Sequence, residues 1–514
     1  MQKLVSVAEM IAIEKAADAA GHTYAKMMER AGASLAEQVL AYGHQGGGSV
    51  LGLVGPGNNG GDTLVALDIL ATQGWTSVAY VVGGRALEDE YMRRAKTSGS
   101  EIFLASGDTT SDKLKALVVE QAVLLDGLLG TGIQLPLREP FSKALKAVKE
   151  TLAELGEKPL AVAVDCPSGM DVESGDFAPQ TLKADLTVCM AAVKRGMLTL
   201  PAFELLGDLV VGDIGLPDEL EEWAGIRRYV IDGEMVRSAL PPRPADAHKG
   251  TFGTAVIVAG SRRFPGAAIL AGEAAYRSGS GLVTIATVES VQPALAGRLP
   301  EATWLPLPEE NGWISPDAAS RLYPELTRAA SVLIGPGLGQ ESQTGEFLSN
   351  LLGRDLPPLV VDADGLKLAA GSKVGVKSLP KDSVLTPHPG EMAILTGLEV
   401  AEIQAARLET AERFAGDWGQ VIVLKGAFTV VSSPDGRSAV LPLASAALAR
   451  AGTGDVLAGI IAGLRAQGMK AFEAACAGVW LHGQAGLRAA NRLRGTAGVL
   501  AGDLIKELPA LIGK

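Results

Sequence analysis

The sequence has few aromatic residues, few cysteines and no excess of basic side chains. Aromatic residues make up 4% of the 514 residues, so stacking platforms for bases or sugars must be few. The three cysteines, Cys166, Cys189 and Cys476, are widely spaced, which excludes a disulfide framework or a cysteine-rich metal site and favours a reducing compartment. A net charge of −12 argues against a nucleic-acid partner.

Long apolar runs are also missing. No stretch of about eighteen residues stays free of charges and glycines, so we expect no membrane-spanning helix and no membrane partner. The first residues do not resemble a signal peptide, because Glu9, Glu14 and Asp18 interrupt the apolar run. Ser6 and Glu9 instead have the spacing of a capping box, which predicts an amphipathic helix to about Ala20. We therefore expect a cytoplasmic protein.

Short β-branched runs alternate with helix-period segments along most of the chain, a rhythm typical of parallel βαβ units with helices on both faces. A charged and then proline-rich segment, residues 216–249, interrupts it, and we place a domain boundary near residue 225. The predicted fold class is therefore α/β with two domains, 1–225 and 226–514. The predicted strands are 50–54, 78–82, 122–125, 160–164, 186–190, 254–259, 282–286, 332–334, 359–361 and 421–424, with helices such as 64–73 and 141–155 between them.

In the first half, strand 50–54 ends in a run of glycines, amides and one acid, residues 55–62, after which we expect a helix. Ligands of parallel sheets bind outside the carboxyl ends of the strands, where this loop must lie. Its glycines allow a ligand to approach the backbone closely, and Asn58 and Asn59 offer donors and acceptors. The alternative is a plain turn followed by an Asp that caps the helix.

Two further acids follow predicted strands of the same half. Asp126 precedes the glycine-rich loop 127–132, and Asp165 precedes Cys166-Pro167-Ser168-Gly169. Each alone could be an ordinary turn residue. Acids gathered at adjacent strand ends repel one another unless one is protonated or a cation lies among them. The cluster therefore predicts a bound cation and an acid/base residue.

Together these motifs resemble the NAD(P)H-hydrate epimerase family. The resemblance implies a Rossmann-like, three-layer domain that interconverts the R and S forms of hydrated NADH or NADPH. It implies that Asp165 is the acid/base residue, and that Asn59, Asp126 and Ser168 ligate a potassium ion. Thr63 stands where the family usually has glycine, and we expect it to narrow the loop. The residues implied to bind the hydrate are Asn58, Asn59, Gly60, Gly61, Asp62, Gly130, Thr131, Gly132, Ile133, Gln134, Leu135 and Pro136.

Near the C-terminus, Gly452-Thr453-Gly454-Asp455 runs into an apolar, helix-period stretch, residues 456–464. The unpaired N–H groups of a helix start, together with the helix dipole, favour a phosphate there. A carboxylate beside a phosphate is costly unless it takes a proton from an attacking hydroxyl. The alternative is that Asp455 only caps its helix. Gly459 and Gly463 predict close packing of this helix on the sheet.

Other motifs of the second half are the run 248–253 (His-Lys-Gly-Thr-Phe-Gly), the turn 335–337 and the run 386–391. His388 stands between two prolines, with Glu391 nearby; the alternative is a structural histidine. Lys425 follows a predicted strand and favours a phosphate contact, although a solvated lysine would look the same.

These motifs resemble the ADP/ATP-dependent NAD(P)H-hydrate dehydratase family, which has a ribokinase-like fold. The resemblance implies phosphoryl transfer to the hydrate's hydroxyl, preferably from ADP, with Asp455 as the base, followed by loss of phosphate. Mg²⁺ is expected on the nucleotide phosphates. Ala267, Gly337 and His388 are implied to bind the hydrate. The implied nucleotide-binding residues lie in the runs 425–429 and 445–454, namely Lys425, Gly426, Ala427, Phe428, Thr429, Ser445, Arg450, Ala451, Gly452, Thr453 and Gly454.

The whole sequence thus predicts a bifunctional repair enzyme that epimerises R- and S-NAD(P)HX and dehydrates the S form, giving AMP (or ADP) and phosphate. Its expected partners are NADHX, NADPHX and ADP or ATP, and we expect a homo-oligomer. One alternative is a ribokinase-like small-molecule or vitamin kinase fused to a ligand-binding Rossmann-like module. Another is a non-catalytic first half, which the retention of Asp62, Asp126 and Asp165 disfavours.

Overall fold

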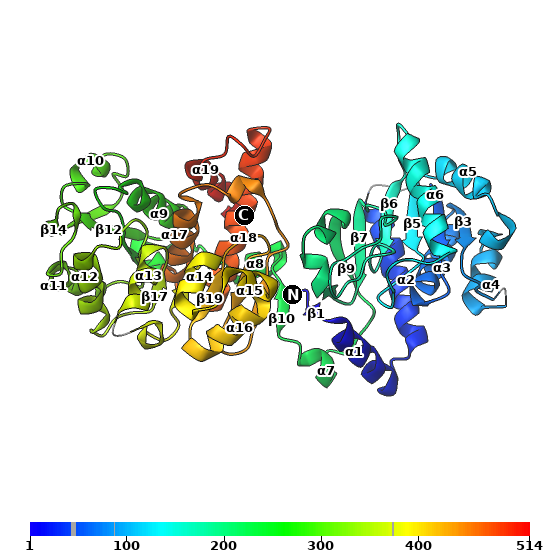
Figure 1. The fold of residues 1–514 in the computed structure, drawn as a ribbon, viewed down its shortest axis with the longest axis horizontal. Helices are drawn as coiled ribbons and strands as arrows, with labels where there is room; N and C mark the ends of the chain where they lie inside the picture. Colours follow the sequence, from blue (N-terminus) through cyan, green and yellow to red (C-terminus); the bar gives the residue numbers. More distant parts are fainter. Residues whose placement is uncertain (43–47, 87, 373–374, 514) are drawn as a thin grey trace. The chain divides into compact units, whose positions relative to one another are not determined.

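The structure, a computed structural model, describes residues 1–42, 48–86, 88–372 and 375–513. The chain divides into two compact units, Gln2–Arg227 and Arg228–Lys514, the second of which also includes Met1. Figure 1 traces helices and strands through both units, and each has its own parallel sheet. The predicted α/β class and two-domain architecture are confirmed.

The sheet of the first unit has seven strands in the described residues, and every neighbouring pair is parallel. The strand order reverses between β2 and β5, which makes the carboxyl ends of these two strands a topological switch point. All five predicted strands are present, whereas the half-exposed edge strands β4 and β9 were not predicted. The order is β4 (Glu101–Leu104), β3 (Thr76–Val81), β2 (Ser49–Val54), β5 (Val123–Gly127), β6 (Leu160–Val164), β7 (Leu186–Met190) and β9 (Asp208–Gly212).

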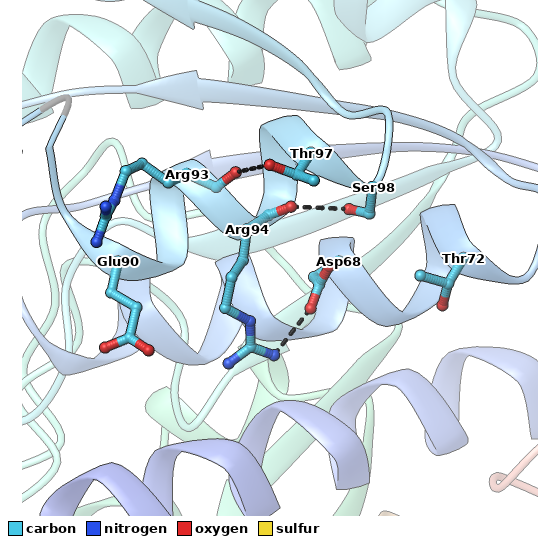
Figure 2. Close-up of a pocket in the computed structure, with 7 residues that line it drawn as sticks. All are labelled: Asp68, Thr72, Glu90, Arg93, Arg94, Thr97 and Ser98. Carbon is cyan, nitrogen blue, oxygen red and sulfur yellow. Dashed lines mark hydrogen bonds and ion pairs between the residues drawn. The ribbon is translucent and has the colours of Figure 1, made fainter.

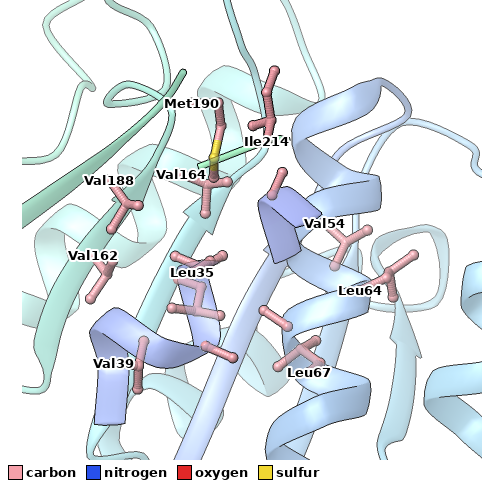
Figure 3. Close-up of a cluster of buried hydrophobic side chains, with 14 of the residues drawn as sticks. Leu35, Val39, Val54, Leu64, Leu67, Val162, Val164, Val188, Met190 and Ile214 are labelled. Atoms are coloured by element: carbon pink, nitrogen blue, oxygen red, sulfur yellow. The ribbon is translucent and has the colours of Figure 1, made fainter. Parts of the chain in front are cut away.

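Helices cover both faces of this sheet, as a three-layer domain requires. Along β2, side chains alternate between two apolar clusters: Val50 and Val54 lie in one, Leu51 and Leu53 in the other. Figure 3 shows the first cluster, to which α2 contributes Leu35 and Val39 and α3 contributes Leu64 and Leu67. The second contains apolar residues of α5 and α6. The helices are α1 (Val7–Ala19), α2 (Tyr24–Ala41), α3 (Asn58–Thr72), α4 (Glu90–Thr97), α5 (Asp112–Glu120), α6 (Phe141–Glu154) and α7 (Glu221–Ala224).

The N-terminal segment is tied to this unit by a short parallel ladder. Strand β1 (Leu4–Val5) pairs with β8 (Val193–Lys194), so that Val5 lies opposite Lys194. Helix α1 follows at once, and its predicted capping box between Ser6 and Glu9 is present. Its buried residues, Met10, Ile13 and Ala17, form one stripe along the helix.

Helix α3 begins at Asn58, not after Asp62, so the prediction of a loop over residues 58–62 was wrong. Tertiary packing outweighs the low helix propensity of its two glycines. A Cβ on Gly60 would come within 2.0 Å of the Gly55 carbonyl oxygen, and one on Gly61 within 2.4 Å of Met28 Sδ on α2. Thr63 lies inside the helix, where its hydroxyl donates to the Asn59 carbonyl at 2.7 Å, so it does not narrow a loop.

In the described residues, the second unit's main sheet has ten strands, and its order reverses between β11 and β16. Neighbours are parallel except β20, which is antiparallel to both β19 and β21. A short antiparallel ribbon, β14 (Glu309–Glu310) with β15 (Trp313–Ile314), lies outside it. The sheet order is β10 (Arg228–Val230), β21 (Ser438–Val440), β20 (Val430–Ser432), β19 (Val421–Leu424), β18 (Val384–Leu385), β17 (Leu359–Val361), β16 (Ser331–Ile334), β11 (Thr254–Val258), β12 (Leu282–Val288) and β13 (Thr303–Leu307).

The helices of this unit include the predicted C-terminal one, α17, which starts at Thr453. None of the helices in the described ranges is both long and apolar enough to cross a lipid bilayer. Their bounds are α8 (Gly233–Ala239), α9 (Gly266–Arg277), α10 (Gln292–Ala296), α11 (Ala318–Leu326), α12 (Ser342–Leu352), α13 (Asp364–Gly371), α14 (Pro389–Thr396), α15 (Val400–Ala405), α16 (Arg407–Trp418), α17 (Thr453–Ala466), α18 (Ala471–Arg492) and α19 (Ala501–Ile512).

The two glycines of α17 face a helix rather than the sheet, which corrects the sequence prediction. A Cβ on Gly459 would lie 2.3 Å from the Ala271 carbonyl oxygen, and one on Gly463 would lie 2.0 Å from Ser278 Oγ. Ala271 belongs to α9, and Ser278 ends it. The glycines therefore let the backbones of α9 and α17 approach closely.

This contact predicts a large cost for a side chain at Gly459. Gly459→Val should lower the free energy of unfolding of the second unit by about 1–3 kcal/mol, because the new side chain overpacks against α9. Gly416→Ala is the matched control: Gly416 lies in α16 with no atom within 4 Å of its Cβ position, and alanine should stabilise that helix by about 0.5–1 kcal/mol. Urea denaturation of both variants measures this, and an unchanged midpoint for Gly459→Val would contradict the packing.

Candidate active sites

The first candidate site lies at the switch point of the first unit. Asn59 is in the first turn of α3, Asp126 lies near the end of β5, and Asp165 and Ser168 follow β6. All four are buried, with exposed fractions of 8% or less. The structure therefore brings together polar residues that the sequence placed at three separate strand ends.

One oxygen in this group has no partner among the described residues. Asp126 Oδ2 accepts the N–H of Ser168 at 2.9 Å, whereas the buried Asp126 Oδ1 has no hydrogen bond within the described part of the chain. Burial raises the pKa of this carboxyl, although the hydrogen bonds from Ser168 oppose the shift. An orphaned buried carboxylate oxygen is the kind of group that a bound cation satisfies.

The neighbouring ligand candidates converge on the same loop. Asn59 donates from Nδ2 to the Leu129 carbonyl at 3.3 Å, and Ser168 Oγ accepts the Leu129 N–H at 3.0 Å. The described part of the chain has no group of three or more acidic, Cys or His side chains suited to a metal. A single carboxylate with one amide and one hydroxyl suits a monovalent cation that prefers oxygen ligands better than it suits a transition metal. The donor set thus fits potassium.

Asp165 is held by a residue that the sequence reasoning missed. Its carboxylate accepts a hydrogen bond from the buried Lys194 ammonium, which also donates to the Met190 carbonyl at 3.1 Å. Asp165 has a backbone φ of 63°, in the left-handed region that is unfavourable for a residue with a side chain. The sequence around Lys194 has no clear strand pattern, because β8 has only two residues. Lys194 comes close to Asp165 only in the folded chain.

The remaining predicted hydrate-binding residues are divided between the site and the surface. Gly130 lies against Asn59, because a Cβ there would be 2.5 Å from Asn59 Oδ1. Gly57, the N-cap of α3, has open space around its Cβ position, so a ligand can approach the helix start. Thr131 and Ile133 are half-buried, whereas Gly132 and Gln134, Leu135 and Pro136 are exposed.

The second candidate site is a charge network at the carboxyl ends of β17 and β19. Lys425 Nζ donates to Asp362 Oδ1 at 2.6 Å and lies 3.7 Å from Glu391 Oε2. The Thr386 hydroxyl donates to the same Asp362 oxygen at 2.7 Å. Burial lowers the pKa of Lys425, but the two carboxylates outweigh burial and raise it overall. Lys425 is therefore a fixed cation within a network, not the solvated lysine of the alternative reading.

Asp455 stands next to this network in the first turn of α17. The helix N-cap is Gly452, so Asp455 is not the cap and the capping alternative is wrong. A Cβ on Gly454 would lie 3.6 Å from Lys425 Nζ. Burial and then the Asp362 carboxylate raise the pKa of Asp455 to about 7, although the Lys425 ammonium opposes the shift. Asp455 therefore exchanges its proton near neutral pH.

The helix start offers fewer free N–H groups than the Gly-Thr-Gly turn suggested. The Thr453 N–H donates to the Arg450 carbonyl at 3.3 Å, and the Thr453 hydroxyl closes the same turn. The next two N–H groups, of Gly454 and Asp455, bond to no backbone carbonyl in the described ranges. These two donors point along the helix axis and suit an anionic oxygen.

The predicted hydrate pocket of this unit is partly assembled. A Cβ on Gly337 would come within 2.8 Å of Ala267 Cβ, so these two predicted residues are in contact. His388 caps α14: its Nδ1 accepts the N–H groups of Gly390 and Glu391, which leaves Nε2 as the protonated nitrogen. Burial lowers the pKa of His388, so the ring is neutral at pH 7.

The predicted nucleotide-binding residues around the turn serve local structure in this protein. Ser445 caps a short 3₁₀ turn by accepting the Ala447 N–H, and Arg450 donates to the Ala497 carbonyl. In the run 426–429, the Thr429 hydroxyl donates to the Gly426 carbonyl at 2.8 Å. Ala427 and Ala451 are exposed, and Phe428, with a φ of 52°, is buried.

Arg407, at the start of α16, is a second residue that sequence reasoning missed. Its guanidinium donates to the carbonyls of Leu424 and Lys425, at 2.8 and 3.2 Å. Burial lowers its pKa to about 10. The group thus braces the strand end from which Lys425 projects, and no local pattern marked it.

The first unit also has a surface pocket. Figure 2 shows its lining from α3, α4 and the residue after α4, with Arg94 paired to Asp68 at 2.8 Å. Arg94 also pairs with Glu29. Its cation is therefore satisfied within the protein. None of the predicted site residues lines this pocket.

Comparison with known proteins is consistent with these two sites. Residues 24–196 match the family described as YjeF-related protein N-terminus, and residues 255–510 match NAD(P)H-hydrate dehydratase. A bifunctional NAD(P)H-hydrate repair enzyme of Moorella thermoacetica is 36% identical over 95% of this chain and 92% of its own length. The enzyme of the same description from Thermofilum pendens is 34% identical over 99% and 95%.

Among solved structures, the ADP/ATP-dependent NAD(P)H-hydrate dehydratase from Bacillus subtilis, co-crystallized with ATP/Mg²⁺, is 35% identical. It covers 55% of this chain and 97% of its own, with a TM-score of 0.47. The family match rests on the relatives that span nearly the whole sequence. The chain belongs to the family of bifunctional NAD(P)H-hydrate repair enzymes.

Proposed function

We propose that this chain repairs hydrated nicotinamide cofactors with one activity in each unit. The first unit epimerises R- and S-NAD(P)HX, and the second dehydrates S-NAD(P)HX at the expense of ADP or ATP. The observation that carries the proposal is the position of Asp455, whose carboxyl has a pKa of about 7. It lies beside the Lys425 network and beside the N–H groups of Gly454 and Asp455, which bond to no backbone carbonyl in the described residues. That combination suits phosphoryl transfer to an alcohol.

In the second unit each group has a separate task. The hydroxyl oxygen of the hydrate attacks the terminal phosphorus of the nucleotide, and Asp455 takes the proton of that hydroxyl. The N–H groups of Gly454 and Asp455 bind the phosphoryl oxygens. Mg²⁺ bound to the nucleotide would neutralise phosphate charge. Ala267, Gly337 and His388 line the hydrate pocket, and the backbone of the runs 425–429 and 445–454 lines the nucleotide. The C–O bond to phosphate then breaks, phosphate leaves, and the neighbouring ring carbon loses a proton to solvent, so that the new C=C bond restores the dihydropyridine of NAD(P)H.

In the first unit, Asn59, Asp126 and Ser168 would hold K⁺, whose charge satisfies the unpartnered oxygen of Asp126. Asp165 acts as the acid/base residue. Residues 58–62 and 130–136 bind the hydrate at the N-terminus of α3. Homo-oligomeric assembly and a cytoplasmic location stay predictions.

The direct test is to supply purified S-NADHX with ADP and Mg²⁺ and to follow the return of NADH absorbance. Asp455→Asn should slow dehydration by about 10²–10⁴-fold, the usual contribution of a general base, and leave epimerisation intact. Asp165→Asn should slow epimerisation and leave dehydration intact, so that R-NADHX persists. The exposed Asp355→Asn is the matched control and should retain both activities. If hydrate is not consumed while another alcohol is stably phosphorylated, the vitamin-kinase alternative is correct.

The pH dependence of dehydration follows from the raised pKa of Asp455. The base must be ionised, so kcat/KM should be constant above about pH 8 and fall as pH drops through about 7. Well below that value it should decrease about tenfold for each pH unit. A profile that stays flat down to pH 5 would show that Asp455 is not the base.

The dependence of epimerisation on potassium should require the Asp126 carboxylate. Epimerisation by the wild-type protein should rise with KCl but not with tetramethylammonium chloride at equal ionic strength. Asp126→Asn should abolish this stimulation, because the Asp126 carboxylate is the only charged group among the three proposed ligands and one of its oxygens has no hydrogen-bond partner in the described residues. Equal rates in the two salts for the wild-type protein would contradict a potassium site.

A further inference from the structure

The carboxylate of Asp165 is paired with a buried cation, Lys194. Lys194 is 1% exposed, and an ion this buried is tolerated only when it is paired and hydrogen-bonded. Burial lowers its pKa, but Asp165 outweighs burial, so that the pKa of Lys194 is raised. Lys194 is therefore a permanent ammonium at the site.

The geometry at Asp165 leaves one of its two oxygens for a ligand. Oδ1 accepts from Lys194 and from the Met190 N–H, the latter at 2.9 Å. Oδ2 accepts no hydrogen bond in the described residues. The left-handed backbone of Asp165 costs energy that the surrounding contacts must offset, and such strain concentrates at functional positions. The carboxylate is thus fixed in direction.

The electrostatic environment of a second carboxyl, Asp62, contrasts with that of Asp165. It is 6% exposed, and its side chain makes no hydrogen bond within the described part of the chain. Burial, then Asp165 and then Glu14, raises the pKa of Asp62 well above its ordinary range, while Arg85 and Lys194 act in the other direction. Two carboxyl groups with contrasting environments are the pattern of an acid and a base.

Glu14, on the N-terminal helix α1, acts on this site through its charge. It follows Ile13 and precedes Ala17, both on the buried stripe of α1, and it is half-buried itself. Burial and then the charge of Asp165 raise the pKa of Glu14. The pairing of Val5 with Lys194 anchors the strand before α1 directly at the site. Helix α1 lies before the region that matches the epimerase-related family, which starts at residue 24.

We propose that Lys194 and Glu14 are positioning residues that divide the two carboxyl groups of this site into a base and an acid. Lys194 supplies the counter-charge that holds Asp165 in its orientation, and Glu14 adds to burial in favouring the protonated, hydrogen-donating form of Asp62. The inference rests on the proposed epimerase function of the first unit. The charged groups that face the pair are Glu14 from α1, Arg85 after β3 and Lys194 from β8.

The assignment accounts for every proton in an epimerisation. Hydration of an enamine leaves the hydroxyl on a ring carbon bonded to nitrogen. Asp62 gives its proton to that hydroxyl, the C–O bond breaks, water leaves, and the nitrogen lone pair forms a C=N bond. Water then adds to the opposite face, the C=N electrons return to nitrogen, and the proton of the added water passes to Asp165. Proton exchange with solvent restores both carboxyl groups.

The test measures epimerisation rates between pH 5 and pH 9 for Lys194→Met, Lys194→Arg and Glu14→Gln. Lys194→Met should lower kcat at pH 7 by more than about tenfold with little change in KM, and it should move the acidic limb of the profile up by about one pH unit. Lys194→Arg retains the charge and should keep most of the activity. Glu14→Gln should move the alkaline limb to lower pH, because Asp62 then loses its proton more easily.

Matched controls come from exposed residues of neighbouring helices. Lys15→Met and Glu37→Gln make the same chemical changes on α1 and α2 and should leave the profile unchanged. A folded Lys194→Met variant with the wild-type profile would overturn the role of Lys194. If that variant does not fold, Glu14→Gln decides, and an unmoved alkaline limb overturns the proposal. A wild-type protein that dehydrates S-NADHX but epimerises nothing at any pH would instead refute the proposed epimerase function.

Discussion

A carboxylate buried in a protein must gain a counter-charge or keep its proton, because a bare charge in a low-dielectric interior is very costly. Both units meet this constraint by pairing an aspartate that follows one strand with a lysine at the end of another, Asp165 with Lys194 and Asp362 with Lys425. Each unit then holds a second aspartate in the first turns of a helix, and this aspartate has no ion pair among the described residues. These are Asp62 in α3 and Asp455 in α17, and both have raised pKa values.

The sheets explain why the same solution occurs twice. In each unit the strand order reverses between two parallel neighbours, β2 and β5 or β11 and β16, and helices start at that edge. Glycines at these starts keep side chains away from the ligand, as the open space at Gly57 illustrates. One aspartate of each unit is thus held by a lysine, while burial raises the pKa of the other.

Much of this edge could be predicted from sequence, because strands buried on both faces appear as continuous apolar runs that end in polar residues. The acids at strand ends were found in this way, whereas the half-exposed strands β4 and β9 were not. Lys194 and Arg407 were missed because their partners lie 29 and 17 or 18 residues away and follow no local pattern. The start of α3 was misplaced because the close packing of Gly60 against Gly55 outweighs its weak helix propensity.

The magnitudes at Asp455 decide which effect controls the proposed base. A helix N-terminus favours a carboxylate by about 0.3–1 kcal/mol at exposed sites. The rise of its pKa from 3.8 to about 7 corresponds to about 4 kcal/mol in the other direction. Burial and the Asp362 carboxylate therefore outweigh the helix dipole and the Lys425 ammonium together. An aspartate with an ordinary pKa would be a weak base for an alcohol, whereas one that titrates near 7 accepts the proton more readily and is still half ionised at neutral pH.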